Sequence, residues 1–292
     1  PHILTLWALI CKLCRGIYIL NGYNLHVHSD IKTEYIEPVI LPGEQILTLQ
    51  TVKGEQLRGC FHNTGKGPIG IYLHGFRSHC NGEKALEIAR HAIAMDRSWL
   101  RFDLRGHGQS DGELKDQIIS SGLDDLLLVM DSIVDRPFIL HGSSMGGWLS
   151  LLAALRRKQR VSGMMLIAPA FNFVQNNLAN LPEPVLKHWQ AETYMAFPDA
   201  YGNEPYSLRY DIIKDAEQYD VLDTQIELDI PVHIVHGEND PIIPIANTDK
   251  FIHRARIPEL IYEAIPNGEH RLTDHISLII RHIDSLWQGL YR

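Results

Sequence analysis

Short apolar runs alternate with helix-like segments through most of this 292-residue chain. In the helix-like segments, such as residues 83–95 and 118–134, apolar side chains recur at the spacing of one helix face. Strands joined through helices by short links form right-handed crossovers, and these build a parallel sheet. The alternation therefore predicts an α/β fold, with a mostly parallel central sheet flanked by helices. The expected strands are 69–75, 98–103, 138–143, 162–170, 231–237 and 259–265, preceded by an antiparallel hairpin around Val52-Lys53-Gly54.

Two stretches depart from this alternation. Residues 171–224 hold many aromatic side chains and four prolines, with short helical candidates between them. We interpret them as a small helical cap inserted into one α/β domain that spans residues 44–292. Residues 1–43 are an N-terminal appendage of unknown role. Lys12 and Arg15 interrupt its apolar run, which suits neither a membrane-spanning helix nor a signal peptide. We expect a cytoplasmic protein without stable membrane insertion.

The composition argues against several classes of function. The formal net charge of -8 is opposite to that of a general nucleic-acid-binding protein, so we expect no nucleic-acid partner. Four cysteines are too few for a disulfide framework, and Cys11-x-x-Cys14 has no second pair to complete a zinc site. The sixteen histidines include no His-Glu-x-x-His pattern. Gly106, Gly108 and Gly112 miss the spacing of a dinucleotide-binding turn. We expect neither a metal nor an organic cofactor.

The sequence GSSMGGW, residues 142–148, stands where an expected strand meets an expected helix. It contains the Gly-x-Ser-x-Gly pattern of a nucleophile elbow, a strained turn that lifts a serine hydroxyl above a sheet. Alone, the pattern is equally compatible with a plain tight turn. Two downstream residues favour the elbow, because Asp240 and His270 each follow a different expected strand, in the chain order serine, acid, histidine. Ser144, Asp240 and His270 are the predicted catalytic residues.

Each of these residue types suits one step of acyl transfer. A serine hydroxyl is a weak nucleophile, and a histidine can take its proton and return it to the leaving group. A carboxylate fixes the tautomer of the histidine and stabilises the imidazolium. Glu238 and His275 compete for the acid and base roles. Asp240 has the expected strand-Gly-x-x-Asp spacing, however, and His275 falls inside the last expected helix, 272–287.

The oxyanion of such a reaction needs backbone donors. The N–H groups of the helix that begins at Met145 would point at it. Phe76, in the loop after the strand at 69–75, would supply the second N–H. Asp103, Arg105, Gly106 and Gly108 are expected to form a structural loop rather than part of the catalytic set.

With these residues in place, the chain resembles the α/β-hydrolases over roughly residues 44–290. More narrowly, it resembles the branch that contains the mitochondrial acyl-glucuronide esterase and protein depalmitoylase, together with its bacterial relatives. The resemblance implies an α/β-hydrolase fold with a small helical cap, no metal or organic cofactor, and a serine hydrolase that cleaves acyl esters or thioesters. The stretches that carry it are HGFRSHCNGEKALEIA, RFDLRGHGQSDGE, GSSMGGWLSLLAAL, YGNEPYSLRYDIIKDA, PVHIVHGENDPIIP and GEHRL.

Carried over residue by residue, the resemblance implies Ser144, Asp240 and His270 as the catalytic set, with Phe76 and Met145 as oxyanion donors. The chain departs from the branch in its N-terminal segment and at position 74, a histidine where some relatives have proline or glycine. The second departure leaves the oxyanion loop intact, because only backbone N–H groups are needed there.

The predicted substrate is a small-molecule acyl ester or thioester that is cleaved through an acyl-enzyme intermediate. A lyase or cofactor-free haloperoxidase on the same triad, and a noncatalytic binding protein of this fold, are the alternatives. The apolar side chains scattered along the cap predict contact with the acyl chain, with Trp189 and Phe197 as substrate-binding residues and a preference for medium or longer chains. The alternative is that these rings only anchor the cap. No oligomeric state is indicated.

Overall fold

The computed structural model describes residues 37–133, 136–199, 201 and 204–290. Within these residues eight strands form one sheet in the order β1-β2-β4-β3-β5-β6-β9-β10. The β1–β2 and β2–β4 pairs are antiparallel and the others are parallel, which confirms the predicted α/β class and the N-terminal hairpin. The strands are β1 (Gln45–Gln50), β2 (Gln56–His62), β3 (Ile69–Leu73), β4 (Ser98–Phe102), β5 (Phe138–Ser143), β6 (Val161–Ile167), β9 (Val232–Gly237) and β10 (Leu260–Ile265).

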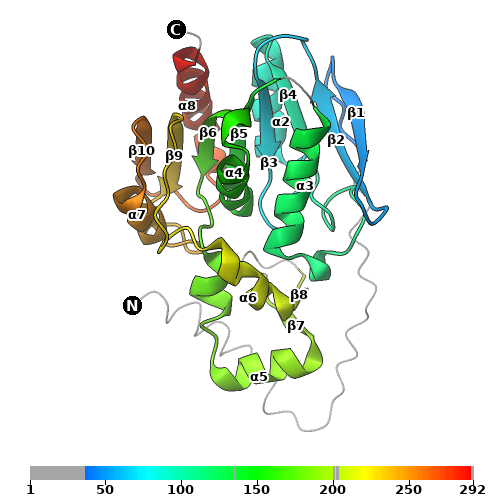
Figure 1. Ribbon diagram of the computed structural model, residues 1–292, viewed down its shortest axis with the longest axis vertical. Helices are drawn as coiled ribbons and strands as arrows, with labels where there is room; N and C mark the ends of the chain where they lie inside the picture. Colours follow the sequence, from blue (N-terminus) through cyan, green and yellow to red (C-terminus); the bar gives the residue numbers. More distant parts are fainter. Residues whose placement is uncertain (1–36, 134–135, 200, 202–203, 291–292) are drawn as a thin grey trace.

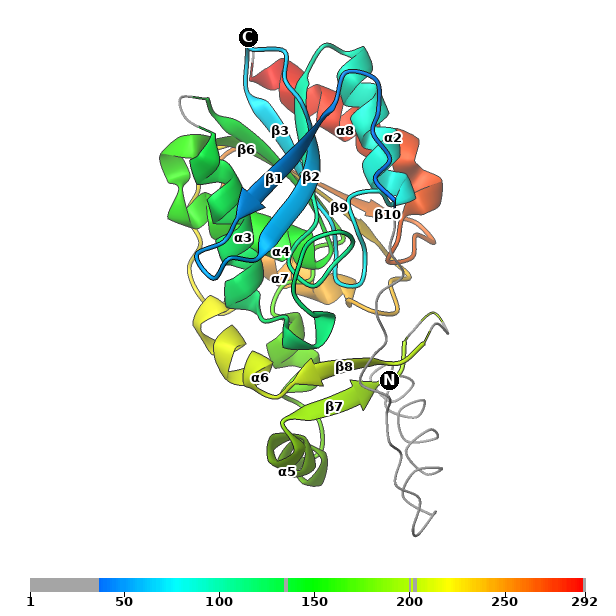
Figure 2. The same ribbon diagram turned by 90° about the vertical axis from the view of Figure 1, so that its right-hand side faces the viewer.

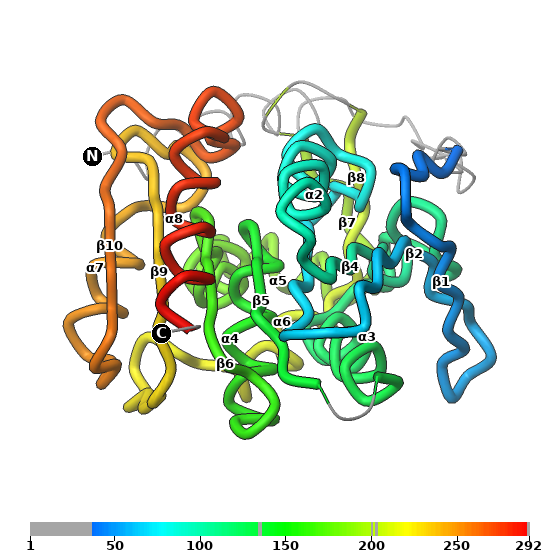
Figure 3. The backbone as a smooth tube through the Cα atoms, turned by 90° about the horizontal axis from the view of Figure 1, so that it is seen from above, coloured from blue at the N-terminus to red at the C-terminus, as the bar shows by residue number. Residues whose placement is uncertain are grey.

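Helices cover both faces of this sheet (Figure 1). On one face lie α2 (Glu83–Ala94) and α8 (Ile276–Gly289), and on the other α3 (Ile119–Ser132) and α4 (Met145–Arg156), as Figure 3 shows from above. Each face buries its own apolar cluster, because successive side chains of a strand point to opposite sides. The strands β3, β4 and β5 are fully buried, and most of their residues are apolar for this reason.

The last helix begins later than the sequence predicts. Residues 273–275 form a 3-10 turn, and α8 starts at Ile276 rather than at position 272. Leu272 has φ 50°, a left-handed conformation that a right-handed helix cannot include. The turn matters because His270 lies just before it.

The segment 171–224 contains more than the short helices that the sequence predicts. It holds a short π-helix at Val174–Leu178, α5 (Glu183–Glu192), α6 (Asp211–Ala216) and a two-stranded antiparallel hairpin, β7 (Tyr194–Phe197) with β8 (Tyr206–Arg209). The hairpin is an element that the prediction of a small helical cap did not include. Four-residue strands are too short for an alternating pattern to stand out beside prolines. We call residues 171–224 the cap segment.

The cap segment lies at one end of the sheet (Figures 1 and 2). The Tyr194 hydroxyl donates to Asp116 at 2.7 Å, and the Ser120 N–H donates to Asp215 at 2.9 Å. These bonds tie the hairpin and α6 to the start of α3, the helix that follows β4. The cap segment therefore stands over the edge where the parallel strands end, which is where this class of sheet binds ligands.

The loop after β4 is structural, as expected. The Asp103 carboxylate accepts the N–H of Cys80 at 2.6 Å and that of Gln109 at 2.9 Å, which joins this loop to the loop after β3. Gly108 has φ 50°, and a Cβ there would lie 2.1 Å from the Asp103 carboxylate. A glycine is therefore required at this position.

None of the helices in the described part of the chain is long and apolar enough to cross a membrane. The N-terminal run of 1–36, with its two cysteines, lies outside the described residues.

Candidate active site

Ser144 occupies a sharp turn between β5 and α4. Its backbone has φ 55° and ψ -120°, a strained combination for a residue with a side chain. Two glycines make room for the turn. A Cβ at Gly142 would lie 2.3 Å from the Gly146 carbonyl oxygen, and a Cβ at Gly146 would lie 2.2 Å from the Leu73 carbonyl oxygen. The helix therefore packs directly on strand backbone, and the geometry is that of a nucleophile elbow.

The three predicted catalytic side chains meet at this turn. The Ser144 hydroxyl lies 2.8 Å from His270 Nε2, and His270 Nδ1 lies 2.6 Å from an Asp240 carboxylate oxygen. With Nδ1 protonated and donating to the carboxylate, Nε2 is free to accept from the hydroxyl. Three loops, after β5, β9 and β10, supply one side chain each. The structure thus brings Ser144, His270 and Asp240 into one hydrogen-bonded row.

Asp240 is held as a buried carboxylate. Its Oδ1 accepts the N–H groups of Ile242 and Ile243, both at 2.8 Å, and its Oδ2 accepts a bond from His236 Nε2 at 3.1 Å. Burial alone would raise the pKa of Asp240, but the hydrogen bonds from His236 and His270 outweigh it and hold that pKa well below its usual range. The carboxylate is therefore ionised at neutral pH and can stabilise an imidazolium.

His236 was not predicted from the sequence. It ends β9 four residues before Asp240, is fully buried, and its Nδ1 lies 2.8 Å from the Thr248 hydroxyl. The signal was present in the stretch PVHIVHGEND, where the second histidine precedes the acid by four residues. A histidine inside an apolar strand is more often a packed core residue, so periodicity alone gave no reason to single it out.

The two predicted oxyanion donors flank Ser144. Met145 is the first residue of α4, so its N–H has no acceptor within the helix. Phe76 lies in the turn closed by the Ser78 N–H and the Gly75 carbonyl at 3.2 Å. A Cβ at Gly75 would lie 2.9 Å from that of Ser144, so this turn is in contact with the elbow. Both donors are thus near the hydroxyl, and their role stays a prediction.

The His74 ring is hydrogen-bonded to the turn of residues 75–78 that carries Phe76, which we call the oxyanion turn. One of its ring nitrogens lies 2.8 Å from the Gly75 carbonyl, and the other accepts the Leu104 N–H at 3.1 Å. Burial lowers the pKa of His74 to about 4, so the ring is neutral and can keep both bonds. The histidine at this position therefore fixes the turn and leaves its N–H groups available.

Trp189 and Phe197 pack against each other within the cap segment, with ring centroids 4.9 Å apart. Trp189 is fully buried, and its indole N–H donates to the Leu208 carbonyl at 2.9 Å. Phe197 also stacks on Tyr206, which in turn contacts Phe76 at 5.2 Å between centroids. These contacts hold the hairpin to α5, so the rings first of all anchor the cap segment. Their predicted contact with substrate stays a prediction.

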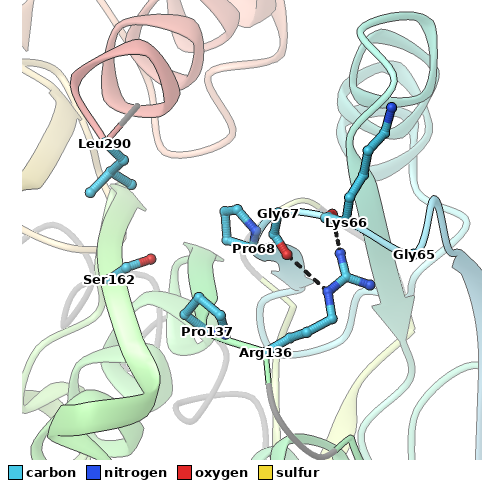
Figure 4. A pocket seen from close by; sticks show the side chains of 8 residues that line it. All are labelled: Gly65, Lys66, Gly67, Pro68, Arg136, Pro137, Ser162 and Leu290. Carbon is cyan, nitrogen blue, oxygen red and sulfur yellow. Dashed lines mark hydrogen bonds between the residues drawn. The ribbon is translucent and has the colours of Figure 1, made fainter. Parts of the chain in front are cut away.

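A surface pocket lies at the opposite edge of the sheet (Figure 4). Pro68, Pro137 and Ser162, at or beside the first residues of β3, β5 and β6, line it, together with Leu290. The Arg136 guanidinium donates to the Gly67 carbonyl at 2.8 Å in its wall. The pocket is therefore separated from Ser144 by the length of the strands.

A mostly parallel sheet with a nucleophile elbow after β5 defines an α/β-hydrolase. A profile of the family described as serine aminopeptidase S33 (Hydrolase_4) matches residues 69–275, and the chain belongs to this family. The rat protein named palmitoyl-protein thioesterase ABHD10, mitochondrial, is 33% identical over 225 residues, which are 76% of this chain and 76% of that protein. Its human counterpart is 31% identical over 225 residues, 76% of this chain and 74% of the human protein.

Two solved structures agree with this assignment. Alpha/beta hydrolase domain-containing protein 10 from mouse superposes with a TM-score of 0.77 at 29% identity, covering 84% of this chain and 99% of the mouse chain. A putative hydrolase from Agrobacterium vitis S4 gives a TM-score of 0.77 at 30% identity, covering 83% of this chain and 98% of the other. The protein is an α/β-hydrolase enzyme that acts on esters or thioesters.

Proposed function

We propose that this enzyme cleaves acyl esters and thioesters by the serine mechanism, with Ser144 as nucleophile, His270 as general base and acid, and Asp240 as the stabilising carboxylate. The observation that carries the proposal is the continuous row from the Ser144 hydroxyl to His270 at 2.8 Å and from His270 to Asp240 at 2.6 Å. Acylation begins when His270 Nε2 takes the hydroxyl proton and Ser144 Oγ attacks the acyl carbon.

The tetrahedral intermediate carries a negative charge on the former carbonyl oxygen. The N–H groups of Phe76 and Met145 donate to it, which stabilises the charge as it develops. When the intermediate collapses, the bond to the leaving oxygen or sulfur breaks and His270 returns its proton to that atom. Water then attacks the acyl-enzyme with His270 again as base, which releases the carboxylic acid and restores Ser144.

For the substrate we propose medium or longer acyl chains, carried as esters or thioesters. The rat and human relatives are named palmitoyl-protein thioesterases, which supports a long acyl group. We further propose that residues 171–224 act as a cap over the acyl site, within a domain of 44–292. Cytoplasmic localisation stays a prediction, and the names of those relatives place them in mitochondria.

The test compares wild type with Ser144→Ala on nitrophenyl esters of increasing chain length and on an acyl thioester. We expect the variant to lose about 10⁶-fold in kcat. Ser132→Ala is the matched control, because that hydroxyl only bonds the Val129 carbonyl in α3. A fluorophosphonate probe followed by peptide mass spectrometry should label Ser144. Retained turnover in Ser144→Ala, or labelling at another serine, would refute the assignment.

A further inference from the structure

Lys84 reaches the residue next to the nucleophile. It is the second residue of α2, and its ammonium donates to the Ser143 hydroxyl at 3.0 Å. Ser143 is the last residue of β5 and is 7% exposed. The two residues are 59 positions apart in the chain, so the bond joins the helix after the oxyanion turn to the strand before the elbow.

Among the described residues, no carboxylate forms an ion pair with the Lys84 ammonium, and Asp240 and Arg271 act on it only through their longer-range fields. Burial, together with the smaller effect of the Arg271 charge, lowers the pKa of Lys84 to about 8 against the opposing charge of Asp240. A desolvated cation without an ion pair is unfavourable for folding, and such groups gather at functional sites. Four lysines elsewhere do have carboxylate partners: Lys66, Lys115, Lys187 and Lys250.

Ser143 also bonds a second buried group. Its side chain is hydrogen-bonded to the hydroxyl of Tyr72, a residue of β3 that is almost completely buried. Lys84, Ser143 and Tyr72 therefore form a polar row that crosses from α2 to β5 and β3. Tyr72 belongs to the buried cluster formed with α2 and α8, whereas the apolar side chains of α4 belong to the cluster on the other face.

The elbow needs such support on both sides of Ser144. A strained backbone conformation persists only where several independent contacts hold it in place. On the far side, the Ser144 carbonyl accepts the Ala170 N–H at 3.0 Å, and the Ser144 N–H donates to Ile167 at 2.9 Å. On the near side, the bonds from Lys84 and Tyr72 are side-chain restraints on Ser143.

We propose that Lys84 is a positioning residue for the reaction. Acting through the Ser143 hydroxyl, it holds the elbow so that the Ser144 hydroxyl meets both His270 and the oxyanion turn. The inference rests on the proposed serine mechanism. Because it concerns the alignment of reacting groups and not substrate contact, its loss lowers kcat and leaves KM nearly unchanged.

A double-mutant cycle tests whether Lys84 acts on kcat through the Ser143 hydroxyl. We expect Lys84→Met and Ser143→Ala each to lower kcat for a nitrophenyl ester by about 10- to 100-fold, with KM within about 3-fold of wild type. The double variant should be no slower than the slower single variant, because both changes remove the same restraint. Lys66→Met, in an exposed loop, is the control. Additive losses, or normal kcat in Lys84→Met, would overturn the inference.

The pH profile separates this role from general stabilisation of the fold. As Lys84 loses its proton above pH of about 8, its bond to Ser143 weakens and wild-type kcat should decline. Arg271 contributes a positive charge near it. Burial raises the pKa of Tyr72 and hydrogen bonds hold the pKa of Asp240 low, so neither of these two groups titrates in that range. In Lys84→Met the alkaline decline should be absent. A decline that persists unchanged would refute the role.

The outcome for Lys84 is distinguishable from that of the proposed function. If the Ser144→Ala variant still hydrolyses the ester, the serine mechanism itself is refuted. If hydrolysis requires Ser144 but Lys84→Met has a normal kcat, only the positioning role of Lys84 is refuted. The melting temperature of each single variant is measured beside its kcat. A lower kcat at an unchanged melting temperature supports the positioning role.

Discussion

Replacing Gly146 with alanine probes how closely α4 must pack on the sheet. The added Cβ would lie 2.2 Å from the Leu73 carbonyl oxygen and 2.6 Å from that of His74. Both atoms belong to the backbone of β3 and its following loop, so neither can rotate away as a side chain could. To restore an ordinary contact of 3.4 Å, the start of α4 has to move by about 1 Å.

That movement displaces the Ser144 hydroxyl and the Met145 N–H together. A misplacement of about 1 Å typically costs about 100-fold in rate, so we expect a loss of that size in kcat/KM. Overpacking should also lower the free energy of unfolding by about 1–3 kcal/mol. The helix propensity of alanine, which exceeds that of glycine by about 1 kcal/mol, offsets part of this cost.

The assay measures kcat/KM on a nitrophenyl ester and unfolding in urea for Gly146→Ala. Gly289→Ala is the matched control: it makes the same change in a helix, at a position where a Cβ would have no neighbour within 4 Å. The control should keep full activity and equal or greater stability. Activity of Gly146→Ala within about 3-fold of wild type would refute the reasoning, because it would mean that the elbow tolerates a displacement of this size.

Three further predictions concern the acid, the cap segment and acid pH. Asp240→Asn should lower kcat by about 10⁴-fold and His270→Ala by about 10⁶-fold, because the carboxylate orients and stabilises while the imidazole moves the proton; the reverse order in steady-state kinetics would contradict these roles. Trp189→Ala should lower the free energy of unfolding by about 3–5 kcal/mol, because the ring is fully buried, and should lower kcat/KM for long-chain esters more than for acetyl esters, whereas an equal loss on both would show that the ring only anchors the cap segment. Burial lowers the pKa of His74 to about 4 and that of His107 to about 3. The unfolded chain therefore binds more protons below pH of about 6.5, and the free energy of unfolding should fall by up to about 1.4 kcal/mol per pH unit for each ring as the pH drops from there towards 4. Urea unfolding at pH 7, 6 and 5 checks this, and His107→Gln should show a shallower slope.

The sheet was predictable because the burial of each strand and helix is visible in the pattern of its own residues. Each parallel strand is buried on both faces, so β3, β5 and β9 appear as apolar runs, and the helices between them show one apolar face. The triad was predictable for a related reason. Parallel strands end at the same edge, so polar residues after three of them are brought together even when more than 100 positions separate them, as with Ser144 and His270.

The supporting residues could not be predicted in this way. Lys84 lies in a helix whose apolar pattern explains its other residues, and its bond to Ser143 depends on how the tertiary fold brings the start of α2 to the end of β5. His236 has the appearance of a core residue until the loop after β9 folds back and brings Asp240 to 3.1 Å. Both roles depend on tertiary contact rather than on spacing, which is why no local pattern indicated them.

The strained residues near the site show where local rules give way to tertiary structure. Arg77, Ser144 and Leu272 all have φ of 50° or more without being glycine, and each lies at or within two residues of a predicted catalytic or oxyanion residue. Contacts from distant segments hold at least the first of them. The Arg77 guanidinium pairs with Asp199 and lies 4.9 Å above the ring of Tyr206, both in the cap segment. Because the same turn carries Phe76, the hairpin of the cap segment and the oxyanion donor are mechanically joined. A local propensity calculation would favour glycine at position 77, yet glycine would release this connection, and the strain is therefore better understood as part of how the site is assembled.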